Sequence, residues 1–131
     1  MVRNWDRLLA GLLALALGAN GLVMLFASLP WYDAVPGVTS TGPFNPHFVK
    51  DIGATYLACA LGCGWFAWRP REGWPALAIA ATWLTVHAGV HVYDATCGAS
   101  PFADLQRDFV GVYLFAAIPL ALTLMRKPKG T

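Results

Sequence analysis

Long runs of apolar residues, separated by short polar segments, dominate the pattern of the chain. Four runs stand out, and each approaches the roughly 20 residues that an α-helix needs to cross a bilayer. Because every backbone hydrogen bond must be satisfied inside the membrane, we expect helices rather than strands. The predicted helices span about 8–29, 46–68, 74–94 and 101–126.

The segments between these runs predict how the helices are joined. Asn45-Pro46 and Ser100-Pro101 each place a capping side chain before a proline at the first helical position. Segment 30–45 is rich in turn formers and lacks apolar periodicity, so we expect an outward loop there. Short connections favour antiparallel neighbours. The chain is therefore predicted to form one all-α transmembrane domain, 1–131, a four-helix bundle with up-down topology.

Composition agrees with a membrane protein. Of the 131 residues, 57% are hydrophobic and 12% charged, whereas soluble domains average about 45–50% and about 25%. The first run is longer than the core of a signal peptide, so we expect it to be retained as a helix. The net charge of +2 and the absence of a basic stripe argue against nucleic acid as a partner. Membrane lipid is the expected surrounding.

Basic residues are sorted between the predicted connections. Seven of the nine lie at the two termini and in the middle turn, namely Arg3, Arg7, Arg69, Arg71, Arg126, Lys127 and Lys129. Cytoplasmic connections carry an excess of Lys and Arg. Both termini are therefore predicted to be cytoplasmic, in a multi-pass protein of the bacterial inner membrane.

Two histidines and a carboxylate share one face of the third predicted helix. His87, His91 and Asp94 in "HAGVHVYD" occupy positions i, i+4 and i+7, which lie on one side of an α-helix. His47 and Asp51 repeat the i, i+4 spacing near the start of the second. At a rise of about 1.5 Å per residue, Asp51 and His91 reach similar depths. The spacing therefore predicts one polar site between the helices.

Ionisable groups inside a membrane are costly, and they mark functional sites. An aspartate near the bilayer centre costs roughly 2.5–3.5 kcal/mol on insertion scales, so such groups face the bundle interior and find partners. We expect Asp94, Asp108, Tyr113 and Asn20 to support the site or to form the wall of a pocket. All histidines fall in the outward half of the predicted bundle, so the site is predicted to face the periplasm.

Three chemistries suit this predicted site. The leading hypothesis is a transition-metal ion, with His87 and His91 as ligands and with His47 and Asp51 as ligands or immediate supports. Histidine and carboxylate ligands suit zinc, iron or manganese. Haem b, held by axial histidines in an apolar pocket, is the less favoured cofactor. The third hypothesis is a metal-free His/Asp acid–base site.

Two classes of function stay open. The first is a metal-binding membrane protein that acts on a lipophilic substrate, and the second is a non-enzymatic accessory subunit of a larger membrane complex. Ala10, Ala14 and Gly18 repeat at the four-residue spacing that permits close helix packing. This pattern favours a homo-oligomer or a larger complex. Cys97 lies in the outward segment "DATCGAS", and two roles stay open for it: a metal ligand or a partner in an intermolecular disulfide.

The segments "VPGVTSTGPFNPHFVKDIGATYLACALG" and "HAGVHVYD" resemble a group of small bacterial integral membrane proteins that carry GPFNPHFVRDIG-like segments. In layout the chain is similar to the DoxX-like membrane proteins. The resemblance covers about residues 30–95, and it implies four helices and an inner-membrane location. It brings no activity with it. His47, Lys50, Asp51 and Gly53 lie inside its most recognisable segment.

Overall fold

The computed structural model describes residues 3–127, most of which are helical and none of which form a strand. The remaining positions, Lys129 among them, lie outside the described part of the chain. The elements are α1 (Asn4–Phe26), α2 (Ser28–Ala34), the 3₁₀-helix η1 (Val38–Ser40), α3 (Pro46–Trp68), α4 (Pro70–Cys97), α5 (Pro101–Asp108), the π-helix η2 (Phe109–Leu114) and α6 (Phe115–Met125). The all-α prediction is confirmed.

Three helical stretches are long and apolar enough to cross a membrane: Asn4–Phe26, Pro70–Cys97 and Pro101–Met125. The helix α3 is as long as α1, but His47, Lys50 and Asp51 fall in its first two turns. The structure therefore supports a helical membrane bundle with three such helices. The fourth span stays a prediction.

The helix starts agree with the prolines, while other boundaries differ from those predicted. The Asn45 side chain accepts hydrogen bonds from the backbone N–H groups of His47 and Phe48, each at 3.1 Å. Pro101 begins α5, although Ser100 makes no capping bond with its side chain. The first predicted helix is divided at Ala27, where the backbone leaves helical geometry before α2. The fourth is interrupted by the π-helix η2.

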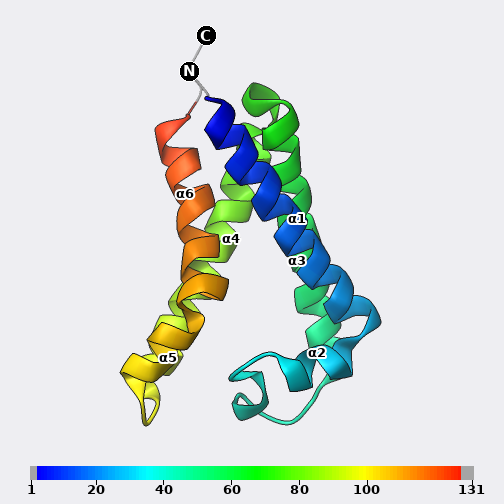
Figure 1. Ribbon diagram of the computed structural model, residues 1–131, viewed down its shortest axis with the longest axis vertical. Coiled ribbons are helices and arrows are strands. Elements are labelled where there is room, and N and C mark those ends of the chain that lie inside the picture. Colours follow the sequence, from blue (N-terminus) through cyan, green and yellow to red (C-terminus); the bar gives the residue numbers. More distant parts are fainter. Residues whose placement is uncertain (1–2, 128–131) are drawn as a thin grey trace.

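The long helices form two pairs, α1 with α3 and α4 with α6, as Figure 1 shows. The pairs converge at the end where α1 begins and α6 finishes, which we call the terminal end. They diverge toward the end that carries α2, η1 and α5, which we call the loop end. Buried side chains at the core include Leu17, Cys63, Phe66 and Leu77, which join α1, α3 and α4.

An ion pair links the two outer helices at the terminal end. Asp6 on α1 is 3% exposed, and its carboxylate lies 2.8 Å from Nε of Arg126 and 3.2 Å from its Nη2. The Nε contact lacks the direction of a hydrogen bond, so Nη2 makes the directed one. The backbone N–H of Arg3 also donates to Asp6 at 2.7 Å. This pair brings α1 and α6 together where the bundle is closed.

Candidate functional site

A cavity of about 800 Å³ lies between the two helix pairs on the loop-end side, and every helix contributes to its wall. The α1–α3 side supplies mainly apolar groups, and loop 35–41 covers part of the rim. The polar side chains come chiefly from α4 and α5. They include His87, His91, Asp94, Asp104, Arg107 and Asp108.

One face of α4 carries the imidazoles into the cavity. His87, His91 and Asp94 all line it, as the i, i+4 and i+7 spacing predicts. The rings of His87 and His91 have centroids 4.8 Å apart and meet edge to face. Trp83, one turn below His87, stacks on that imidazole with centroids 5.0 Å apart and planes 9° from parallel. These contacts fix the orientation of His87.

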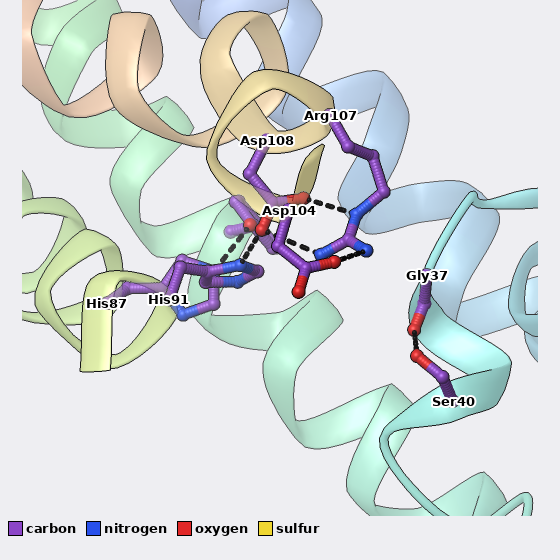
Figure 2. A network of polar contacts seen from close by, with 8 residues as sticks. Gly37, Ser40, His87, His91, Asp104, Arg107 and Asp108 are labelled. Atoms are coloured by element: carbon purple, nitrogen blue, oxygen red, sulfur yellow. Dashed lines mark hydrogen bonds and ion pairs between the residues drawn. The ribbon is translucent and has the colours of Figure 1, made fainter. Parts of the chain in front are cut away.

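His91 makes the shortest polar contact between helices in the cavity. Its Nδ1 lies 2.7 Å from Oδ2 of Asp108, and Asp108 is only 8% exposed. Arg107 holds the same carboxylate, with Nε 2.8 Å from Oδ1 and Nη2 3.1 Å from Oδ2. Nη1 of Arg107 also donates to Asp104 at 2.6 Å. The four side chains form one chain of charge-assisted hydrogen bonds, which Figure 2 shows.

This network indicates which ring nitrogen of a neutral His91 carries no proton. An ionised carboxylate can only accept hydrogen bonds, and a doubly bonded guanidinium favours the ionised form. The proton of a neutral His91 ring therefore belongs on Nδ1, facing Asp108. Nε2 then carries the lone pair. It can accept a proton or bind a metal ion.

The second imidazole faces a phenol on the other helix pair. Nε2 of His87 lies 3.2 Å from the hydroxyl of Tyr56 on α3. Tyr56 also meets Trp83 edge to face, with centroids 5.4 Å apart. The contact connects α3 to α4 through the cavity wall, so both imidazoles have a polar partner on a different helix.

Asn20 lines the cavity as predicted, whereas Tyr113 does not. The side-chain oxygen of Asn20 accepts a hydrogen bond from the indole N–H of Trp31 at 2.8 Å, which joins α1 to α2. Tyr113 lies in η2 and packs against the core. Its hydroxyl is buried without a partner in the described part of the chain. The predicted role of Tyr113 as a pocket wall is therefore corrected.

His47 and Asp51 also lie away from the cavity, contrary to the predicted ligand set. They pair with each other at 3.3 Å on the surface of α3, with side chains 87% and 61% exposed. Ile52 and Tyr56 are the α3 residues that line the cavity. Asp51 is about 100° around the helix from Ile52. Asp51 therefore points away from the cavity, although its predicted depth is similar to that of His91.

The loop before η1 covers the guanidinium of Arg107. Gly37 has φ +86°, a left-handed conformation that glycine adopts freely. A Cβ atom at this position would lie 2.6 Å from both Cζ and Nε of Arg107. In Figure 2 the segment from Gly37 to Ser40 lies beside the Arg107 side chain. Glycine is favoured here because any other residue would be strained at this φ, and its side chain would also have to displace the guanidinium.

Sequence reasoning missed Tyr56, Asp104 and Arg107 as site residues. A signal existed for two of them, because Asp104, Arg107 and Asp108 stand at i, i+3 and i+4 and so share one side of a helix. Tyr56 gave no such signal. Its contact with His87 becomes evident only when the packing of α3 against α4 is known.

Across residues 3–127, no group of three or more His, Cys, Asp or Glu side chains is arranged to hold a metal ion. Within the cavity, the imidazoles of His87 and His91 are the pair closest to that arrangement. Metal binding stays a prediction.

Comparison of the chain with known protein families, with curated proteins and with solved structures gives no match. The resemblance noted in the sequence stays a prediction as well.

Proposed function

We propose that this protein binds a small lipophilic molecule in the cavity and exchanges a proton with it through the His91–Asp108 pair. The observation that carries the proposal is the 2.7 Å contact between Nδ1 of His91 and Asp108 at the wall of a cavity of about 800 Å³. Histidine changes protonation near neutral pH, and a carboxylate on one nitrogen directs the other toward a substrate.

The shape and lining of the cavity support a lipophilic ligand. Cavities of roughly 300–1,000 Å³ with apolar walls and a few convergent polar groups are typical of small-molecule sites. The apolar wall here includes Leu17, Ile52, Val112 and Phe115. In a bilayer, the divergence of the helix pairs at the loop end would give the ligand a route from the lipid.

The proposal includes a topology with four spans. Basic residues of the terminal end, including Arg7, Arg71 and Arg126, favour a cytoplasmic location for that end. The helix α3 would be the fourth span, with its polar first turns at the outer interface. The cavity would then open to the periplasmic side of the inner membrane.

The test fills the cavity without disturbing the packing. Gly111 lines the cavity, and a Cβ atom there meets no heavy atom within 4 Å. Gly89 has the same open surroundings but lies outside the lining, so Gly89→Phe is the matched control. Each protein would be purified in nanodiscs, extracted with organic solvent and analysed by mass spectrometry.

We expect a lipophilic compound to be retained by the wild type and by Gly89→Phe, and to be lost from Gly111→Phe. Identical extracts from all three proteins would contradict the proposal. Extracts without any enriched compound, from the wild type included, would show that the cavity does not retain a ligand.

A second candidate function, binding of a transition-metal ion, is favoured by one observation. The His87 and His91 rings lie 4.8 Å apart, and Asp108 orients His91 as carboxylates do behind metal-bound histidines. Elemental analysis and a visible spectrum of the wild type would be compared with a His87→Ala/His91→Ala double variant. Near-stoichiometric metal lost in the variant would support this candidate. No metal in either protein after metal addition would exclude it.

A further inference from the structure

The charges that line the cavity do not balance. Asp94, Asp104 and Asp108 contribute three carboxylates, whereas Arg107 is the single Lys or Arg residue in the lining. With neutral imidazoles, two negative charges remain uncompensated. An excess of one sign of charge along a cavity draws in ligands of the opposite sign and repels those of the same sign.

Asp94 is the lining carboxylate that pairs with no basic group among the described residues. Asp104 and Asp108 share the guanidinium of Arg107, at 2.6 and 2.8 Å. Within residues 3–127, the Asp94 side chain takes part in no ion pair, although it lies on the same cavity face as His91. A ligand in the cavity can therefore meet a negative charge that is not already neutralised.

In the wall of the cavity, two of these carboxylates already hold one cationic group of the chain. The guanidinium of Arg107 lies between Asp104 and Asp108, and the backbone at Gly37 closes over it. Figure 2 shows this arrangement from close by. The donor and acceptor chemistry of the site therefore suits a positively charged group that donates hydrogen bonds or is weakly hydrated.

Aromatic and aliphatic groups complete the lining. Trp31, Tyr56 and Phe115 supply ring faces or edges, and Leu17 and Val112 supply apolar surface. Aromatic rings attract cations within about 6 Å of their centroids, most strongly where water is excluded. A bare inorganic ion would leave this apolar surface unused, whereas an organic cation with a large apolar body would cover it.

We infer that the cavity selects a lipophilic organic cation, of the class of protonated amines, quaternary ammonium ions and phosphonium ions. The inference rests on the proposed function, because it names the ligand class of the same cavity. The cationic centre lies near Asp94 and Asp104, and the apolar body lies against the α1–α3 wall.

Three probes of similar shape and different charge test this inference. Binding of tetraphenylphosphonium, tetraphenylborate and neutral triphenylphosphine oxide would be measured by calorimetry on the full chain in zwitterionic nanodiscs, with empty nanodiscs subtracted. Asp94→Asn removes the unpaired carboxylate. Asp33→Asn is the matched control, because Asp33 is also exposed and outside every ion pair of the described residues, but does not line the cavity.

We expect saturable binding of the phosphonium at one site per chain, at least about tenfold tighter than either other probe. Asp94→Asn should weaken it several-fold and Asp33→Asn should leave it unchanged. Equal binding of the oxide or the borate, or an unchanged Asp94→Asn, would overturn cation selection while leaving a ligand-binding cavity. Failure of the phosphonium to bind above empty nanodiscs would overturn this inference, whereas the proposed function is decided separately by the extracts of the wild type and Gly111→Phe.

Discussion

His91 illustrates how much a single contact decides at the scale of the residue. Its Nδ1 lies 2.7 Å from Asp108, and this contact sets the orientation of the ring. Arg107 keeps that carboxylate in place with two further contacts. The orientation of the ring and the identity of its open nitrogen thus depend on residues of another helix, 16 and 17 positions along the chain.

The tautomer of His91 provides a direct test of this arrangement. In the wild type we expect the neutral ring to carry its proton on Nδ1, which nitrogen-15 NMR of histidine-labelled protein can read. Asp108→Asn removes the ionised acceptor, so the ring should shift toward the Nε2–H form. The loss of charge-assisted hydrogen bonds should also lower the free energy of unfolding by about 1–3 kcal/mol.

Asp104→Asn is the control for this experiment, because Asp104 contacts Arg107 and not His91. It should leave the His91 nitrogen shifts close to those of the wild type. Unchanged shifts in Asp108→Asn would mean that the pair does not set the tautomer.

Glycine contacts determine how closely the elements approach. A Cβ atom on Gly53 of α3 would lie 2.8 Å from Cβ of Met24 and 3.0 Å from the carbonyl oxygen of Gly21, both on α1. A Cβ atom on Gly21 would in turn lie 2.7 Å from the carbonyl oxygen of Gly53. Two helix backbones therefore touch at this point, as small residues permit in membrane helices.

Gly53→Ala should force α1 and α3 apart. We expect a loss of about 1–3 kcal/mol in the free energy of unfolding, because the atoms that the new methyl group meets belong to backbone or to a Cβ. Gly89→Ala is the matched control, since its Cβ atom meets nothing within 4 Å. Thermal denaturation in detergent micelles would compare the two, and equal midpoints would show that the α1–α3 contact is not close.

The π-helix η2 is the other element with consequences for the site. It follows Asp108 directly and places Gly111 and Val112 at the cavity. Single π-helical turns inside longer helices occur frequently at functional sites, because they rotate the side chains that follow. Here the turn separates the polar residues of α5 from the apolar residues of α6.

At the scale of the whole molecule, the helix pairs converge at one end and diverge at the other (Figure 1). The cavity is lined by residues of both pairs and lies on the diverging side. The Asp6–Arg126 pair joins α1 and α6 at the terminal end. No comparable ion pair joins those two helices at the loop end among the described residues. The space between the helix pairs therefore depends on how the helices pack together and not on any single helix.

Removal of one member of this pair should be costly. Among the described residues, Arg126→Gln leaves the buried Asp6 carboxylate with Arg3 as its remaining basic partner, and we expect a loss on the order of 3 kcal/mol in the free energy of unfolding. The double variant Asp6→Asn/Arg126→Gln should recover most of it. Arg69→Gln, which breaks an exposed pair with Glu72, should change stability by less than about 1 kcal/mol. Additive effects in the double-mutant cycle would show that the pair does not clamp the bundle.

Several features could be predicted because they depend on local pattern alone. Apolar run length predicted the helices, and Asn45-Pro46 predicted the start of α3 to the residue. The i, i+4 and i+7 spacing predicted that His87, His91 and Asp94 share a face. The division at Ala27 had a local signal that the prediction overlooked, because Pro30 lacks the backbone N–H that would bond to the carbonyl of Phe26, the last residue of α1. The π-helix had no comparable signal in the sequence pattern.

The sequence by itself therefore determined the helical class, the apolar lengths and the face on which α4 carries its imidazoles, since these follow from backbone geometry within one helix. Only the tertiary structure decided which partner each imidazole meets. Asp108 rather than Asp51 reaches His91, because rotation of α3 about its axis turns Asp51 to the surface and Tyr56 to the cavity. Rotation and divergence of helices are set by packing between segments distant in sequence, which no single helical pattern contains.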